Sequence, residues 1–167
     1  MKKIFNIALL LGMMLCAGAA DRLAIAEPIN KGGMQPQDVE AVWGMLEASV
    51  DGGYELISRS ALKAMMTEIG LTTSSDLMNL NSSQKARLGE IKTVKYLLVP
   101  TVSKFGSRIN LSLIMVDSST GSIDPDKKAS ETFNSLDELA DKLKDTLAEI
   151  GLGPWPKNAA NPQFSPR

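Results

Sequence analysis

The stretch "KYLLVPTVSKFGSRINLSLIMVDSSTG", residues 95–121, decides the fold because it predicts two strands joined by a tight turn. Tyr96–Ser103 is a strongly apolar run, and the Gly-Ser pair at 106–107 is a hairpin turn. Arg108–Asp117 alternates apolar and polar residues at first and then becomes apolar on both faces, as in a strand that enters a core. Pro100 lacks a backbone N–H, so it predicts an edge position or a bulge in the first strand.

Upstream of this hairpin, short strands alternate with helices. Ser60 and Gly70 are typical of the start and the end of a helix. Asn81 and Gln84 have the spacing of a capping box, and residues 71–80 between them and the preceding helix read as a loop. We therefore expect strands at Arg22–Glu27 and Tyr54–Ser58, and helices at 36–50, 60–69 and 81–91.

Downstream, a turn at 118–121 leads to a weaker strand around Lys127–Thr132. Ser135 and Glu138 then have capping-box spacing, and the helix that follows ends at Gly151. The predicted order is β-α-β-α-α-β-β-β-α. This order predicts a single α/β (α+β) domain in which helices pack on a mixed β-sheet.

The amino terminus has the pattern of a removed export signal. Two lysines precede an apolar run at 4–15 that is too short to span a bilayer, and small residues follow it. Cleavage sites are present after Ala19 and after Ala26, and only the first keeps Arg22–Glu27, the strand that the first helix needs as a partner. We therefore expect a signal peptide at 1–19, a domain at 20–151 and a flexible carboxy-terminal tail at 152–167.

Cys16, the single cysteine, raises the alternative of a lipid anchor. A lipid-modified cysteine follows a small residue, and here the bulky Leu15 precedes it, which favours a plain cleaved signal. No later run is long enough for a membrane span. The sequence thus predicts a periplasmic protein that has no integral membrane span and, after cleavage, no cysteine for a disulfide.

Composition excludes many kinds of chemistry. The chain has no histidine, which removes the commonest general base and metal ligand. The 18 basic and 19 acidic residues contain no basic block, which disfavours nucleic acid as a partner. Asp124 and Asp126 are a carboxylate pair that could act as acid and base, but a polar turn beside a strand explains them better. We expect no catalytic residue, no metal site and no cofactor.

The predicted hairpin tip is the candidate contact site. Lys104, Phe105 and Arg108 place an aromatic residue between two cations at an exposed turn. Aromatic residues and arginine are enriched in the cores of protein interfaces. We expect these three side chains to contact a partner protein.

Three segments resemble a known family. "RLAIAEP" at 22–28, "YELISRSALKAMMTEIG" at 54–70 and "KYLLVPTVSKFGSRINLSLIMVDSSTGSI" at 95–123 resemble the domain shared by the curli-secretion protein CsgG, the penicillin-binding-protein activator LpoB and the amino-terminal domain of TolB. The resemblance covers about residues 22–151. It implies a non-catalytic domain that binds other envelope proteins, builds secretion assemblies or activates peptidoglycan synthesis.

Residues and resemblance together predict a non-catalytic periplasmic adaptor or activator. Its partner is expected to be another envelope protein, such as a peptidoglycan synthase or a secretion component. A self-assembling structural subunit, which forms homo-oligomers through an exposed sheet edge, is the alternative. A hydrolase with a Ser-Lys or carboxylate pair is a third reading that no motif in the chain favours.

Overall fold

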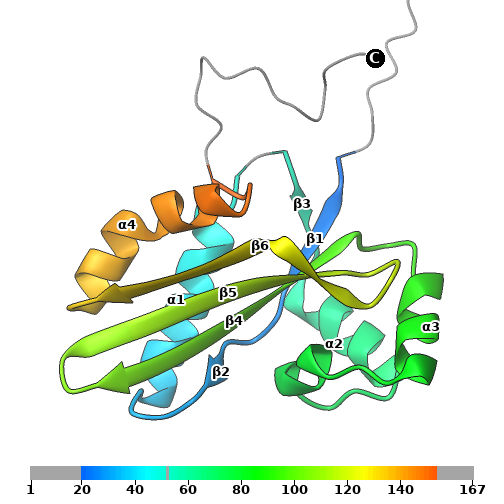
Figure 1. The fold of residues 1–167 in the computed structure, drawn as a ribbon, viewed down its shortest axis with the longest axis horizontal. Coiled ribbons are helices and arrows are strands. Elements are labelled where there is room, and N and C mark those ends of the chain that lie inside the picture. The colour runs from blue at the N-terminus through cyan, green and yellow to red at the C-terminus, as the bar shows by residue number, and fades with distance from the viewer. Residues whose placement is uncertain (1–19, 52, 154–167) are drawn as a thin grey trace, which may run out of the picture.

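The structure is a computed structural model that describes residues 20–51 and 53–153. The predicted signal peptide, Cys16 and the tail beyond Gly153 lie outside these residues. The described chain forms one α+β domain, as predicted, in which helices pack on a mixed six-stranded sheet (Figure 1). Its elements are β1 (Arg22–Ile25), β2 (Ile29–Asn30), α1 (Pro36–Ser49), β3 (Glu55–Leu56), α2 (Arg59–Glu68), the 3-10 turn η1 (Ser74–Met78), α3 (Ser82–Glu90), β4 (Tyr96–Phe105), β5 (Arg108–Asp117), β6 (Ser122–Phe133) and α4 (Leu136–Glu149).

The observed order is β-β-α-β-α-α-β-β-β-α, with one strand more than the prediction. The extra strand, β2, has two residues and lies in the segment that was expected to be a loop. The expected loop at 71–80 also contains η1, which begins with a reciprocal cap between Thr73 and Asp76. Both elements are too short to give a hydrophobic period, which is why the sequence pattern did not predict them.

The sheet has the strand order β3-β1-β4-β5-β6, and β2 pairs with β4 beyond the end of β1. β1 runs parallel to both β3 and β4, so the predicted leading strand lies inside the sheet. β4 and β5 pair antiparallel over their full length, from Tyr96 opposite Asp117 to Phe105 opposite Arg108. The hairpin that the sequence predicted is therefore the longest part of the sheet.

Pro100 does not lie at an edge or in a bulge, so this prediction is wrong. β4 is an interior strand, and its neighbour changes from β1 to β2 at this position. The Ala26 N–H donates to the Leu98 carbonyl, and in a continuous ladder Pro100 and then Pro28 would supply the next two N–H groups. Proline has no N–H, so both bonds are missing and the neighbouring strand breaks there.

Two apolar cores lie on opposite faces of the sheet. α1 and α4 cover the first face, where Val42, Leu46 and Leu143 pack against β4 and β5. α2, η1 and α3 cover the second face, where Leu62 and Leu88 pack against shorter stretches of the same strands. Figure 1 shows α2, η1 and α3 gathered at one end of the long strands, with α1 and α4 toward the other end.

The helix ends follow the predicted caps with two differences. Asn81 and Gln84 form the predicted reciprocal capping box of α3. α2 begins one residue earlier than predicted, because Ser58, rather than Ser60, accepts the first N–H. Leu152 is fully buried beyond Gly151, so the packed domain extends past the end of α4 into the first residue of the expected tail. No helix in residues 20–51 and 53–153 has the length and apolar character that crossing a membrane requires.

Candidate protein-contact site

The β4–β5 hairpin ends in a tip that exposes one aromatic side chain. Phe105 is 76% exposed, and it is the one large hydrophobic residue exposed in the described part of the chain. A two-residue turn follows it, in which Gly106 has a φ of 62° that favours glycine. Paired strands hold Phe105 directly opposite Arg108. The tip therefore presents a fixed aromatic group instead of a loose loop.

The predicted trio divides between the two faces of the hairpin. Phe105 and Arg108 are cross-strand partners on the same face, whereas Lys104 pairs with Ile109 on the face of the first core. Lys104 is also half-buried, and Arg108 is exposed. The structure therefore brings together two of the three predicted contact residues. The sequence could not decide this, because the face of each residue depends on the strand register.

The segment after β2 supports the base of the tip. The Lys31 N–H donates to the Val102 carbonyl at 2.8 Å, and the Lys104 N–H donates to the Gly32 carbonyl at 2.9 Å. Gly33 has a φ of 79°, and a Cβ at this position would lie 2.2 Å from the Lys104 carbonyl oxygen. Only glycine allows the chain to approach β4 so closely, so Gly33 holds the tip in place.

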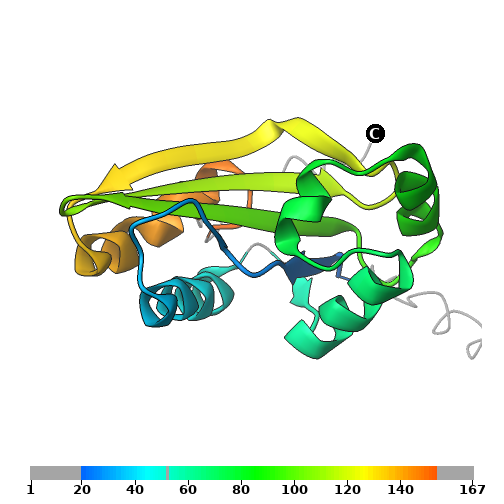
Figure 2. The same cartoon turned by 90° about the horizontal axis from the view of Figure 1, so that it is seen from below.

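The face of the sheet that carries Phe105 has no helix at this end. Its residues toward the base of β4 enter the second core, but those toward the tip are polar and half-buried or exposed. Figure 2 shows α1 and α4 on one side of the strands near the tip and no helix on the other. The open face is formed by Thr101, Ser103, Asn110, Ser112, Lys128, Ser130 and Thr132.

β6 forms one edge of the sheet and has no strand on its outer side. The carbonyls of Leu98 and Val102 on β4 face β1 and β2. Backbone groups alternate in direction along each strand, so the pairings of β4 with β5 and of β5 with β6 determine which N–H groups of β6 face β5 and which face outward. The N–H groups of Lys128, Ser130 and Thr132 point outward, away from β5. This edge is therefore able to accept another strand.

Asp124 and Asp126 lie in β6, where the register against β5 shifts between Ile114 and Val116. The Asp126 N–H donates to the Asp124 carboxylate at 3.0 Å. These residues thus form a bulge within the edge strand and not the predicted turn beside it. No group of three or more acidic, histidine or cysteine side chains in residues 20–51 and 53–153 could hold a metal ion.

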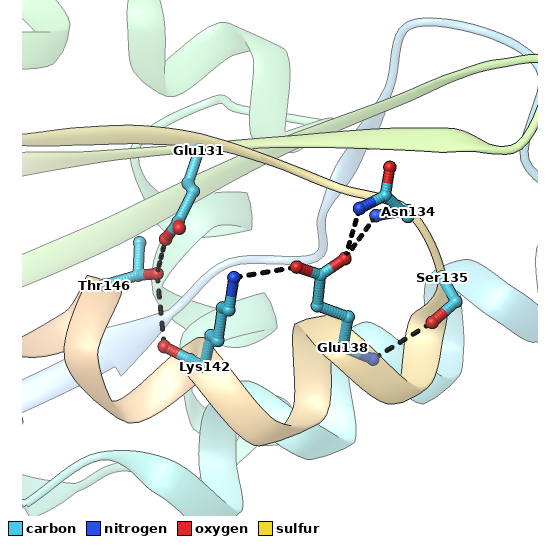
Figure 3. A network of polar contacts seen from close by, with 6 residues as sticks. All are labelled: Glu131, Asn134, Ser135, Glu138, Lys142 and Thr146. Carbon is cyan, nitrogen blue, oxygen red and sulfur yellow. Dashed lines mark hydrogen bonds and ion pairs between the residues drawn. The ribbon is translucent and has the colours of Figure 1, made fainter.

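A polar network fastens α4 beneath the β6 edge (Figure 3). The Thr146 hydroxyl is buried and donates to the Glu131 carboxylate at 2.6 Å. At the start of α4, the Glu138 carboxylate accepts from the Asn134 N–H and side chain, and it pairs with Lys142 at 2.7 Å. The bond to Lys142 and those from Asn134 lower the pKa of Glu138 to about 2. The network keeps the edge strand and its helix together.

A second surface feature centres on Trp43 of α1. Its indole N–H donates to the Ile25 carbonyl at 3.1 Å. The pairing of β1 with β3 ends before Ile25, so the indole takes the place of a strand N–H at this carbonyl. The Arg59 guanidinium lies 3.7 Å from the centre of the indole ring. Arg59 also pairs with Glu47 at 2.8 Å and with Glu40, and these two carboxylates raise its pKa above the usual value. The cluster joins α1 to α2.

A cleft of about 430 Å³ lies at the start of β1 and β4, and four of its charged residues form two ion pairs. Arg22 pairs with Glu55 at 3.0 Å, and Lys95 pairs with Asp21 at 2.6 Å. Asp21 raises the pKa of Lys95, so this amine is held in its charged form, which is not nucleophilic. Lys92, the second lysine of the cleft, donates to the Gly89 carbonyl at 3.0 Å.

Comparison with known proteins identifies the class of fold. No protein-family model matches the sequence, and no curated protein matches it. The lipoprotein GNA1162 from Neisseria meningitidis has a TM-score of 0.51 and 15% identity, over 76% of this chain and 96% of that one. At this identity the match shows a shared fold.

Two further solved structures are similar. The LpoB C-terminal domain from Salmonella enterica has a TM-score of 0.48 and 18% identity, over 69% of this chain and 83% of that one. A PelC dodecamer from Paraburkholderia phytofirmans has a TM-score of 0.44 and 13% identity, over 80% of this chain and 90% of that one. LpoB is also among the proteins that three segments of the sequence resemble.

Proposed function

We propose that the chain is a non-catalytic protein-binding domain of the cell envelope, which acts as an adaptor or activator of another envelope protein. The exposed Phe105 carries this proposal. A large apolar side chain at the end of a rigid hairpin, beside Arg108 and next to a face with no helix, has the chemistry of an interface anchor. Burying such a side chain in a partner contributes about 1.5–3 kcal/mol.

The envelope location rests on the predicted export signal, and it agrees with GNA1162, which is a lipoprotein. The partner follows from the sequence resemblance, which favours a peptidoglycan synthase or a secretion component. A non-catalytic role agrees with the lack of histidine and of any recognised nucleophile motif.

The test is cross-linking in intact cells from the hairpin tip. A photoreactive amino acid at Ser107 should capture one envelope protein, and the same group at Lys144, on the exposed side of α4, should not. Phe105→Ala should reduce the capture about tenfold or more, because the lost burial is worth about 1.5–3 kcal/mol, while the unfolding midpoint stays unchanged. Equal capture from both positions, or capture that Phe105→Ala leaves unaltered, contradicts the proposal.

The outer edge of β6 favours a second candidate, a subunit that assembles with copies of itself. The outward N–H groups of Lys128, Ser130 and Thr132 on this twelve-residue strand form a template for strand addition. Sedimentation across a concentration series should then reveal growing homo-oligomers. Ser130→Pro removes one outward N–H without breaking a bond to β5, so it should abolish the growth and keep the fold. A monomer at all concentrations rules out this candidate.

A further inference from the structure

We propose that a groove beside Trp43 is a binding site for a lysine or arginine side chain of a partner protein. The proposal rests on the protein-binding function above and adds a second contact, on the other side of the sheet from Phe105. The groove has a volume of about 280 Å³ and is lined by Glu27, Pro28, Asn30, Pro36, Val39, Glu40 and Trp43.

The groove lies beside the break between β1 and β2. Pro28 and Pro100 remove two consecutive bonds between this part of the chain and β4, so the link from Ala26 to Pro28 leaves the ladder. The amino-terminal half of α1 crosses this link and contributes Val39 and Trp43. Pro28 lines the groove together with its neighbour Glu27, so the groove lies at the break in the ladder.

The floor of the groove is apolar and rigid. Pro28 and Val39 are buried beneath it, and Trp43 forms one wall. The bond from the indole N–H to the Ile25 carbonyl fixes the orientation of the ring. Arg59 stacks over one face of the indole and is not among the residues that line the groove, whereas Trp43 does line it.

The rim of the groove is acidic. Glu40 shares Arg59 with Glu47, so one cation serves two carboxylates. Glu27 also lines the groove, is exposed, and has no ion pair or side-chain hydrogen bond in the part of the chain that the structure describes. The groove therefore carries net negative charge and has one carboxylate ready to accept a charged hydrogen bond.

This combination matches a long basic side chain. The methylene groups of lysine or arginine pack on apolar surface while the charged end stays polar, and a cation beside an indole is stabilised further. The volume lies slightly below the 300–1,000 Å³ that is usual for small-molecule sites, which suits a single side chain and not a whole cofactor.

The probe for this site is Nα-acetyl-lysine methylamide, with Nα-acetyl-norleucine methylamide as its uncharged counterpart. Binding is followed by the NMR signal of the Trp43 indole N–H in the purified exported protein. The chain has two tryptophans, so Trp155→Phe leaves one indole signal and assigns it. The lysine probe should shift this signal saturably, together with the amides around Glu27, and the norleucine probe should bind at least tenfold more weakly.

Glu27→Gln should weaken the lysine probe about threefold, since it removes a charged acceptor from the exposed rim of the groove. Glu90→Gln, an exposed substitution on α3, is the matched control and should have no effect. Equal binding of both probes, an unaltered affinity in Glu27→Gln or an unshifted indole signal overturns the proposal. The readout does not involve the hairpin tip, so the groove and the tip contact succeed or fail separately.

Discussion

Prolines, which have no backbone N–H, and glycines, which have no side chain, determine where a strand breaks in this sheet and where two segments approach closely. Pro28 and Pro100 remove two hydrogen bonds and split one strand into β1 and β2. The sequence predicted an irregularity at Pro100 but placed it at an edge or a bulge. The error has a physical reason: only the strand register shows that Pro28 lies next to Pro100, so that two consecutive N–H donors are missing and the neighbouring strand breaks inside the sheet.

Gly33→Ala is expected to destabilise the protein by about 2 kcal/mol or more. The new Cβ would overlap the Lys104 carbonyl, and alanine at positive φ costs a further 1–2 kcal/mol. Gly70→Ala is the matched control, because Gly70 has the same φ of 79° but no atom within 4 Å of its Cβ position. Urea unfolding compares the two variants. Equal unfolding midpoints would mean that the contact with β4 is not needed.

Among the elements, α4 shows what a sequence pattern specifies and what it leaves open. The Ser-x-x-Glu spacing predicted the start of the helix, and the Ser135 hydroxyl does accept from the Glu138 N–H at 3.1 Å. The Glu138 carboxylate, however, accepts from Asn134 instead of closing a reciprocal box on Ser135. The geometry of the turn after β6 determines which neighbouring N–H group the Glu138 carboxylate accepts from. The Ser-x-x-Glu spacing carries no information about that geometry.

Glu138→Gln is expected to lower the unfolding midpoint at neutral pH. The folded state holds the pKa of Glu138 at about 2, below the ordinary value of 4.5, so the ionised form stabilises the fold above about pH 4.5. This contribution is lost as the pH falls from about 4.5 to about 2. The difference between variant and parent should therefore shrink over that range in urea unfolding. A difference that is constant with pH would show that the carboxylate charge has no part in the cap.

Ser135→Ala is expected to cost about 1 kcal/mol, the usual effect of losing an N-cap side chain. Urea unfolding at neutral pH measures it. Ser130→Ala, an exposed serine on β6, is the control and should stay within about 0.5 kcal/mol of the parent. A loss at Ser130 as large as that at Ser135 would contradict the role of the cap.

At the scale of the whole molecule, one sheet carries two cores. The class of fold and most of its elements were predictable, because periods of two and of 3.6 residues mark strands and helices directly. The groove beside Trp43 was not predictable, since it depends on how α1 crosses a break between strands. The sequence also could not predict that Lys104 lies on the opposite face of the sheet from Phe105 and Arg108, because this depends on the strand register of the hairpin.

Leu143→Ala and Leu88→Ala test whether the two cores belong to one cooperative unit. Both side chains are fully buried, one on each face of the sheet, so each truncation should cost about 2–5 kcal/mol. The sites share no partner, and the double variant should therefore show the sum within about 0.5 kcal/mol and unfold in a single transition. Two separate unfolding transitions would mean that the cores are independent.

The position of β1 inside the sheet has a consequence for the time at which the chain can fold. Leu23 pairs with Leu56 of the two-residue strand β3 on one side and with Tyr96 of β4 on the other, so the first strand to be synthesised waits for its longer partner far along the chain. Closing so long a loop delays the parallel pairing, and sheets rich in distant pairings fold in milliseconds to seconds rather than microseconds. The predicted export signal gives this delay a use, because a chain that crosses a membrane has to stay unfolded and β1 lacks its longer partner until β4 has been made.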